Sequence, residues 1–434
     1  MKIPHTITEY GTIRRGADYP GRDNSLTELF LPDTAFDALK RLAAEPEADT
    51  ILTFSLQKGR EVLRTRNYVG LLETRNGTQL EILPKITTTL PTMRLALLQM
   101  LRHVQDSPFR QLGTAHVKAA HLPLREVLIT AFLADVAPVV AQGLQRAYVP
   151  TEATLPVLRG KWRMAEQIRR HVVHAERFAV EYDAFTADIP PNRLLKACLQ
   201  FVAPRARTIA NQTRIRQLLF ALDEVPASGR VRDDLQAAQT GNRLLLRYSP
   251  VLRWAEILLL NRSIGVSAGR HLTLALLFPM ERVFEAYVAA GFRRVVPADE
   301  LTIQESSAHL VEEHGGRPTF RLRPDLIIRR PNQLIIVDTK WKTIHGTGAG
   351  DAPDAGTYGI EQADLYQLYA YGKKYNATEL VLIYPANETF TQPLRLFGYD
   401  PTLTLRVIPF DLTNVLDDEV EKVLNFTLLY RPAT

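Results

Sequence analysis

The stretch RPDLIIRRPNQLIIVDTKWK, residues 323–342, contains two apolar runs that each carry an aspartate at one end. Residues 334–337 form a continuous apolar run of the kind that a strand buried on both faces shows. Because side chains alternate along a strand, Asp338 and Lys340 lie on the same face. Asp325 opens the preceding run after a proline, and a hairpin through residues 329–333 brings the charged ends together. The stretch predicts a strand pair with a charged site at one edge.

Two carboxylates beside a lysine are the groups that a hydrolytic Mg²⁺ site needs. Mg²⁺ takes few protein oxygens and keeps positions open for water and phosphate. Lys340 would orient or help to deprotonate the attacking water and stabilise charge on the phosphate, without binding the metal itself. The alternative is a solvated ion pair between Asp338 and Lys340, worth less than about 1 kcal/mol. The D-x-K pattern alone is too short to exclude that alternative.

A helix is predicted after the loop that follows, over EQADLYQLYAYGKKY, residues 361–375. It carries Asp364, Gln367 and Tyr371 at positions i, i+3 and i+7, which share one face. A packed core aromatic is an equal alternative for Tyr371. The helix therefore adds a row of polar side chains to the same region of the sequence.

Composition sets broad limits on the class of protein. A chain of 434 residues with 46% apolar content can form about three globular domains of roughly 150 residues each. The formal charge of +6 fits a polyanionic partner but does not require one. The single cysteine, Cys198, excludes a disulfide framework and a multi-cysteine zinc site, and is interpreted as a small core residue.

The chain is expected to be cytoplasmic and to make no membrane contact. The N-terminus lacks the apolar core of a signal peptide. The most apolar stretch, residues 127–144, contains Asp135 and Pro138, so it predicts a buried helix and not a membrane span.

The apolar pattern divides the chain into three predicted domains. Residues 1–90 contain short β-type runs, and residues 91–265 are mainly helical, with a loop at TADIPPN (186–192) because of its two prolines. Residues 266–434 alternate helices and strands, beginning with a helix over LALLFPMERVFEAYVAAGF (274–292). We therefore expect a β-rich N-terminal domain, a helical middle region and an α/β C-terminal domain.

The order PD, D-x-K thirteen residues later and Q-x-x-x-Y on the next helix resembles the PD-(D/E)xK nuclease superfamily, in particular its RecB-related branch. Longer segments of the sequence resemble the McrC family of McrBC modification-dependent restriction systems. The segments that carry this resemblance are FRLRPDLIIRR, LIIVDTKWK, ADLYQLYAYGKKY and LVLIYP, with LEILPKI, LRGKWRMAEQI, FAVEYDAFTADIPPNRLLK and FPMERVFEAYV outside the nuclease region. The resemblance spans most of the chain and is weakest near the N-terminus.

The resemblance implies a restriction-endonuclease-like C-terminal domain, a mixed sheet flanked by helices. It assigns metal binding to Asp325 and Asp338 and catalysis to Lys340. A helical acid that binds or tunes the metal matches Glu285, with Glu281 as the competing choice and an exposed helix face as the alternative for both.

Three further site residues follow from the same resemblance. Thr339 would offer its main-chain carbonyl to the metal. Gln367 and Tyr371 match the Q-x-x-x-Y pair, which would hold the substrate backbone or the active-site lysine.

The implied function is that of a Mg²⁺-dependent endonuclease subunit, with Mn²⁺ as a substitute, that cuts methylated double-stranded DNA by metal-activated water. The implied partner is a McrB-like GTPase hexamer, which the N-terminal domain would contact and stimulate, with Lys85 as a speculative finger residue. The chain has no G-x-x-x-x-G-K-[ST] loop, so none of its own motifs binds a nucleotide. The alternatives are a stand-alone RecB-like repair exonuclease and a non-catalytic, GTPase-activating assembly subunit.

Two other patterns leave alternatives open. The glycine-rich segment GTGAGDAP, from Gly346, is interpreted as a flap near the active site, with a linker as the alternative. The middle region carries a basic series, interpreted as a solvated face with a DNA-binding or partner-binding face as the alternative. Its histidines, which lack a third ligand, are taken as surface residues. The series consists of Arg159, Lys161, Arg163, Arg169, Arg170, His171, His174 and Arg177.

Overall fold

The computed structural model describes most of the chain and divides it into two compact units. One unit combines Met1–Leu124 with Ser263–Thr434, and the other is Arg125–Arg262. The division into three domains at residues 90 and 265 remains a prediction. The described residues are 4–46, 49–86, 89–104, 107, 109, 122–170, 176–239, 243–260, 262–263, 266–267, 272–346, 357–394 and 397–429.

The N-terminal module of the first unit contains two four-stranded sheets and a helix around one apolar core. Ile13, Phe36 and Leu72, from the first sheet, the helix and the second sheet, are all fully buried in this core. Most elements of this module are strands. One sheet has the order β3 (Glu28–Leu31), β2 (Thr12–Arg15), β5 (Arg60–Thr65), β4 (Leu52–Gln57), and helix α1 is Asp33–Ala43. The other has the order β1 (His5–Thr8), β7 (Gln79–Leu83), β6 (Tyr68–Thr74), β13 (Leu272–Pro279).

Strand β13 corrects one sequence-based prediction. The helix expected over residues 274–292 begins only at Met280, and residues 272–279 form a strand antiparallel to β6. A short run that is apolar at every position fits a buried strand as well as a buried helix. Here pairing with the edge of β6 makes residues 272–279 a strand, and Pro279 marks the start of α10 (Met280–Val295).

A buried ion pair holds the helix that follows the N-terminal module. In α2 (Leu90–Leu101), Arg94 donates through Nε and Nη2 to the two carboxylate oxygens of Glu81, at 2.8 and 2.7 Å. Thr6 and the backbone N–H of Leu124 donate to the same carboxylate at 2.9 and 3.0 Å. Such a network is satisfied only while all its members are present.

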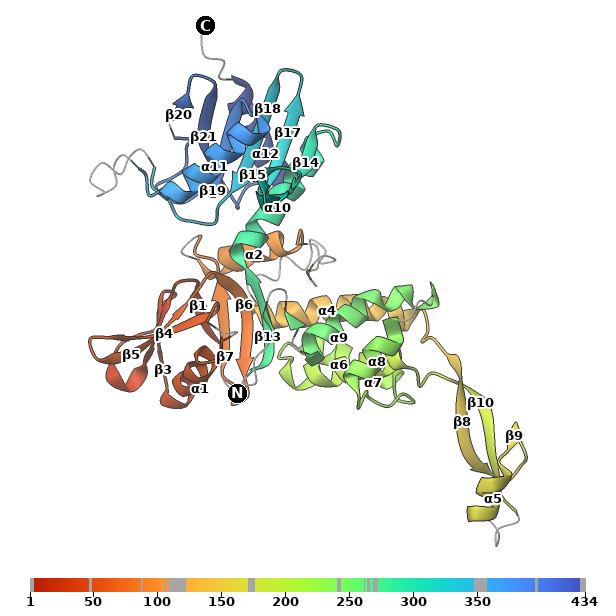
Figure 1. Cartoon of the computed structure of the whole chain (residues 1–434). Coiled ribbons are helices and arrows are strands. Elements are labelled where there is room, and N and C mark those ends of the chain that lie inside the picture. The colour runs from red at the N-terminus through yellow and green to blue at the C-terminus, as the bar shows by residue number, and fades with distance from the viewer. Residues whose placement is uncertain are drawn as a thin grey trace. The chain divides into compact units, whose positions relative to one another are not determined.

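The second unit combines a helical bundle with a long β-hairpin (Figure 1). Prediction and structure agree on the helices, but Pro190 and Pro191 lie in the first turn of α6 and not in a loop. Proline is tolerated there because the first-turn N–H groups have no partner within the helix. The helices are α4 (Leu124–Ala141), α6 (Pro190–Val202), α7 (Ile209–Ala221), α8 (Val231–Gln239) and α9 (Ser249–Leu260).

The sequence prediction of a mainly helical middle region missed this hairpin, which we call the arm. Strands β8 (Ala147–Leu155) and β10 (Phe178–Thr186) pair over nine residues, with β9 (Lys161–Trp162) beside β10 and helix α5 (Met164–Arg170) between them in sequence. Side chains along β8 alternate between half-buried and exposed, the two-residue period of a strand. The residues AYVPTEATL do not alternate strictly between apolar and polar types, so the sequence does not reveal this period.

The C-terminal part of the first unit is a six-stranded mixed sheet covered by helices (Figure 1). Helix α11 (Gln362–Tyr375) packs on one face through Leu368 and Tyr371. Helix α10 packs on the other face, where the Phe284 ring meets Phe410. The order is β14 (Leu301–Ile303), β17 (Leu326–Arg330), β18 (Gln333–Thr339), β19 (Glu379–Pro385), β21 (Leu403–Phe410), β20 (Phe397–Asp400).

The remaining elements are short, apart from the last helix. Helix α12 (Leu416–Leu429) packs beside α10, and β15 (His309–His314) pairs with β16 (Arg317–Arg321). Strands β11 (Arg262–Ser263) and β12 (Val266–Ser267) form a two-stranded ribbon. Short 3₁₀ helices are η1 (Gly16–Asp18), η4 (Ala203–Arg205) and η5 (Arg243–Tyr248). Among the described residues, no helix is both long and apolar enough to span a bilayer.

Candidate functional site

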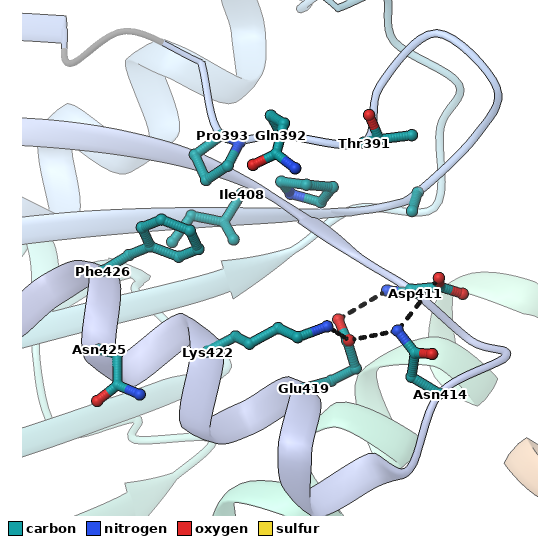
Figure 2. A pocket seen from close by; sticks show the side chains of 12 residues that line it. Thr391, Gln392, Pro393, Ile408, Asp411, Asn414, Glu419, Lys422, Asn425 and Phe426 are labelled. Carbon is teal, nitrogen blue, oxygen red and sulfur yellow. Dashed lines mark hydrogen bonds and ion pairs between the residues drawn. The ribbon is translucent and has the colours of Figure 1, made fainter.

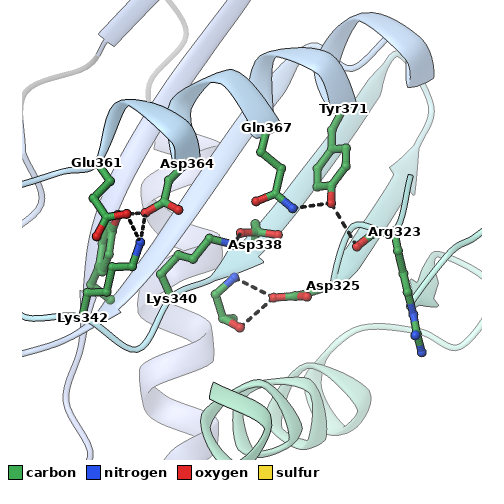
Figure 3. A network of polar contacts seen from close by, with 11 residues as sticks. Arg323, Asp325, Asp338, Lys340, Lys342, Glu361, Asp364, Gln367 and Tyr371 are labelled. Atoms are coloured by element: carbon green, nitrogen blue, oxygen red, sulfur yellow. Dashed lines mark hydrogen bonds and ion pairs between the residues drawn. The ribbon is translucent and has the colours of Figure 1, made fainter. Parts of the chain in front are cut away.

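The predicted hairpin forms and brings its two aspartates together. Strands β17 and β18 are antiparallel with Leu326 opposite Val337, so the same register places Asp325 opposite Asp338. The connection is the two-residue turn Pro331–Asn332, with Asn332 at φ 69°, the combination of residues that favours a type II turn. Figure 3 shows both carboxylates beneath helix α11.

Asp325 is held by the end of the neighbouring strand. Its Oδ2 accepts hydrogen bonds from the backbone N–H and the hydroxyl of Thr339, both at 2.7 Å. Burial raises the pKa of Asp325, and the two hydrogen bonds from Thr339 oppose that effect. Thr339 therefore acts as a donor that fixes Asp325, while its predicted role as a carbonyl ligand remains untested.

Asp338 is the most deeply buried acid of the site, with 2% of its surface exposed. Burial, followed by repulsion from Asp325, raises its pKa to about 7. Lys340 donates to Asp338 from the same face of β18. Burial alone would lower the pKa of Lys340, but the Asp338 carboxylate outweighs it and the pKa rises. The pair is therefore a buried interaction and not the solvated ion pair considered as the alternative.

Glu285 approaches Asp325 from helix α10. Glu285 and Asp325 line one cleft of about 590 Å³, and burial followed by the charge of Asp325 raises the pKa of Glu285. Its Oε1 accepts a hydrogen bond from Gln304 at 2.6 Å. The competing acid, Glu281, lines a different cleft with Asp49 and Arg66. The geometry thus favours Glu285 over Glu281 as the third acid.

Gln367 and Tyr371 form a hydrogen-bonded pair on α11 above the carboxylates (Figure 3). Gln367 Nε2 donates to the Tyr371 hydroxyl at 2.7 Å, and that hydroxyl donates to the carbonyl of Arg323 at 3.3 Å. Tyr371 is 4% exposed and belongs to the core. It is therefore a packed core aromatic whose hydroxyl steadies the segment that leads into Asp325.

Asp364, on the same helix, serves a second lysine. Its Oδ2 accepts from Lys342 Nζ at 2.8 Å, and Lys342 also pairs with Glu361 at 2.9 Å. These contacts link the residues after Lys340 to the first turn of α11. Lys342 belongs to the stretch 323–342, but the sequence pattern does not distinguish its role from that of Lys340.

The donor set fits a divalent cation by its chemistry. Asp325, Asp338 and Glu285 are oxygen donors whose pKa values are all raised by burial, and the charge of Asp325 raises those of Asp338 and Glu285 further. A nearby cation would relieve the resulting penalty on their charge. No three His, Cys, Asp or Glu side chains of the described residues are already close enough together to form a metal cluster. A metal ion bound by all three would require their side chains to rearrange.

Sequence reasoning missed the cationic lining of the same cleft. Arg282, Arg293 and Arg323 line it together with His103, whose pKa burial lowers to about 4, so that its ring is neutral at pH 7. Helical spacing predicts that Arg282 and Arg293, three turns apart on α10, share a face with Glu285. Arg323 stood in the opening stretch without an assigned role.

The other predicted residues lie elsewhere in the chain. Cys198 is fully buried and burial raises its pKa, which confirms the interpretation as a core residue. In the arm, Arg169 pairs with Glu166 at 2.8 Å and Arg159 lies 4.4 Å from the centre of the Tyr182 ring. His171, His174 and most of the glycine-rich segment after Gly346 lie outside the described residues.

A second cleft, of about 390 Å³, lies between α12 and the end of β21 (Figure 2). Glu419, 3% exposed, accepts from the backbone of Asp411 at 3.1 Å, from Asn414 at 2.8 Å and from Lys422. Its carboxylate therefore holds the start of α12 in place. The cleft is a structural feature, distinct from the acidic site on β17 and β18.

Comparisons with known proteins place these observations in a family. Residues 63–385 match the family described as McrBC 5-methylcytosine restriction system component. Among curated protein sequences, no significant match is found.

Two solved structures are similar to the chain. The first is described as "Refined half-complex from tetradecameric assembly of Thermococcus gammatolerans McrB AAA+ hexamers with bound McrC". The likeness has 18% identity and a TM-score of 0.67, and covers 98% of this chain and 100% of that chain. The second is described as "Cryo-EM structure of the Thermococcus gammatolerans McrBC complex", with 22% identity and a TM-score of 0.43 over 68% of this chain and 88% of that chain. The first likeness shows a shared fold.

Proposed function

The chain belongs to the McrBC 5-methylcytosine restriction system component family, and on that premise we propose that it is the DNA-cleaving subunit of such a system. The observation that carries the proposal is the meeting of Asp325, Asp338 and Lys340 at one edge of the β17–β18 hairpin. The reaction is Mg²⁺-dependent hydrolysis of a phosphodiester bond in double-stranded, methylated DNA.

Each residue of the site has a role that its surroundings support. Asp325, Asp338 and Glu285 would hold the metal ion, and the Thr339 carbonyl would be an additional ligand. A bound Mg²⁺ would lower the pKa of a water molecule and neutralise charge on the phosphate. Lys340, released from Asp338, places its ammonium group beside the attacking water and the developing negative charge.

The cationic lining of the cleft provides for the rest of the substrate. Arg282, Arg293 and Arg323 surround the acids and would bind phosphates on either side of the cleaved bond. These contacts carry no sequence information, because the phosphate backbone is the same for every base. Selection of methylated cytosine is therefore a task for the partner.

That partner is a McrB-like GTPase hexamer. The similar structure from Thermococcus gammatolerans contains McrB AAA+ hexamers with bound McrC, and this chain shares its fold over 98% of its length. The N-terminal module is the docking surface predicted from the sequence, with Lys85 as a candidate finger residue.

The arm is a second candidate docking surface. It exposes several large apolar side chains, and such exposed apolar surface marks interaction sites. Tyr148 and Ile168 are 71% and 65% exposed, and Leu158, Trp162 and Phe185 are exposed as well. Replacing Leu158 and Ile168 with serine tests the arm, and Lys85→Ala tests the N-terminal module. The readouts are co-purification with the hexamer and its GTP hydrolysis rate.

The decisive experiment is cleavage of methylated and unmethylated plasmid with Mg²⁺ and GTP, in the presence and absence of the hexamer. We expect cleavage only of methylated DNA and only with the partner, and none by Asp338→Asn. Asp364→Asn is the matched control, since Asp364 is a buried acid on helix α11 that pairs with Lys342.

Other outcomes identify the alternatives. Cleavage by the isolated chain from DNA ends favours a stand-alone RecB-like repair exonuclease. Stimulation of GTP hydrolysis without cleavage under any metal favours a non-catalytic assembly subunit. Full cleavage by Asp338→Asn would show that the assigned site is wrong.

A further inference from the structure

Glu9 is a buried acid that the proposed mechanism leaves without a role. It follows strand β1 in the N-terminal module, and 2% of its surface is exposed. Its backbone N–H donates to the carbonyl of Leu83, at the end of β7, at 2.9 Å. The carboxylate is thus fixed at the edge of the sheet that β1, β6, β7 and β13 form.

One oxygen of Glu9 joins two distant segments. Oε1 accepts the backbone N–H of Lys85 at 3.0 Å and the indole N–H of Trp341 at 2.7 Å. Lys85 belongs to the N-terminal module, whereas Trp341 directly follows the candidate catalytic Lys340. The two contacts lie within one compact unit of the chain.

Trp341 contacts the N-terminal module through Glu9 and also contacts helix α10. It is 6% exposed, and its ring meets Phe284 of α10 edge-on, with ring centres 5.3 Å apart. Phe284 directly precedes Glu285, the third acid of the site. The backbone N–H of Lys340 donates to Ile383 at 2.9 Å, so the residue before Trp341 is tied to β19. The indole therefore lies next in sequence to Lys340 and in contact with the neighbour of Glu285.

We propose that Glu9 is a positioning residue for the nuclease site, acting through Trp341 on Lys340 and Glu285. The inference rests on the proposed function of that site. By holding the indole N–H and the backbone N–H of Lys85 with one oxygen, Glu9 makes the placement of the catalytic segment depend on the N-terminal module. A partner that moves this module would therefore change the position of the catalytic lysine.

The other oxygen of Glu9 supports a role beyond packing. Oε2 is buried and has no hydrogen-bond partner among the described residues. An apolar residue or a fully bonded amide would avoid this cost, since buried polar groups are normally paired. The carboxylate thus retains an acceptor for Trp341 where stability alone would not require one.

The test uses the full chain with its hexamer and measures single-turnover cleavage. Glu9→Ala is expected to lower the cleavage rate at least about tenfold with DNA affinity unchanged, because a small misplacement of a catalytic group costs rate and not binding. Glu9→Gln keeps the acceptor oxygen and is expected to restore the rate to within about threefold of wild type. Trp341→Phe, which removes the N–H donor but keeps an aromatic ring, is expected to match Glu9→Ala, and the double variant to be no slower than either.

A spectroscopic readout separates positioning from general damage. The chain has three tryptophans, so 5-fluorotryptophan labelling gives three ¹⁹F signals, and Trp341→Phe identifies the one from Trp341. Glu9→Ala should shift that signal alone. Glu73→Gln is the matched control, a buried acid of the same sheet that accepts a hydrogen bond from Gln79. It should leave the Trp341 signal and the cleavage rate unchanged.

The outcomes distinguish this inference from the proposed function. If wild type cleaves, Asp338→Asn does not, and Glu9→Ala cleaves at the wild-type rate, the role of Glu9 is wrong while the nuclease site remains. Equal loss in Glu9→Gln and Glu9→Ala, or additive losses in the double variant, also overturns it. If Asp338→Asn cleaves as wild type does, the site itself is wrong.

Discussion

A divalent cation should stabilise this chain in a strongly pH-dependent way, because the metal must replace a proton on Asp338. The pKa of that carboxyl is raised from 3.8 to about 7 in the folded chain, mainly by burial. A raised carboxyl pKa contributes stability that is lost as the pH rises through the folded value. Between pH 5.5 and 7 the unfolded carboxylate is ionised while the folded one keeps its proton. The metal-free chain should therefore lose roughly 2 kcal/mol from Asp338 over this range.

The same proton determines the metal affinity. At pH 8 the Asp338 carboxyl is mostly ionised, whereas at pH 5.5 roughly one molecule in thirty has the charge in place, given a pKa of about 7. A metal concentration about 100-fold above the dissociation constant at pH 8 adds about 2.7 kcal/mol to the free energy of unfolding. Affinity that is roughly thirtyfold weaker at pH 5.5 reduces this gain to about 0.9 kcal/mol.

The assay is thermal unfolding with and without Mg²⁺ at both pH values and constant ionic strength. For a chain of 434 residues each kcal/mol corresponds to about 1 °C, so the melting temperature should rise by about 3 °C at pH 8 and by about 1 °C at pH 5.5. Asp338→Asn should abolish the difference, and Asp364→Asn should retain it, because Asp364 is paired with Lys342 and is no proposed ligand. Equal shifts at both pH values, or a full shift in Asp338→Asn, would refute the reasoning.

Three further predictions concern catalysis and the N-terminal module. Lys340→Met should lower the single-turnover cleavage rate by a factor of about 10²–10³, because the ammonium group acts on charge that develops in the transition state. DNA binding, measured by filter retention, should be unchanged. Arg94→Met leaves the buried Glu81 carboxylate without its ion pair, and should lower the free energy of unfolding in urea by about 3–5 kcal/mol; an unchanged urea midpoint would contradict this. Gly70→Ala should lower the same quantity by at least about 2 kcal/mol, because Gly70 has φ 130° and a Cβ would lie 2.0 Å from the Leu276 carbonyl. Expression of a stable Gly70→Ala chain with the wild-type melting temperature would show that this close approach is absent.

The sequence revealed the central hairpin because its signals were local. A continuous apolar run, a proline–asparagine turn and two aspartates at matching distances from that turn suffice to place Asp325 opposite Asp338. Several strands within residues 1–90 and most helices of the middle region were predicted for the same reason. Their apolar periodicity depends on neighbours in the sequence and not on distant contacts.

The errors arose where distant segments decide the structure. Strand β13 is apolar at nearly every position, and only the edge of β6 makes it a strand. The arm consists of two strands with half-buried and exposed faces, so neither carries the apolar run that indicates a buried strand. The partner of Trp341 lies more than 300 residues away at Glu9, and no local pattern indicates that contact.

The candidate site was predicted in part. The residues on β17 and β18 were identified, and Tyr371 occupies the core position that was its alternative. The cleft arginines and Gln304 were missed because their relation to Asp325 depends on the packing of α10 against the sheet. The roles of all these residues in catalysis remain predictions.

Strand β13 has a consequence for biosynthesis. When residues 1–100 have been made, three strands of the sheet β1–β7–β6–β13 have been synthesised, but the fourth, Leu272–Pro279, is still more than 150 residues from being made. Until then β6 presents an open edge to other nascent chains, the kind of edge that promotes aggregation. Fragments that end before residue 272 should therefore aggregate, and an isolated N-terminal module should need β13 attached to it by a linker.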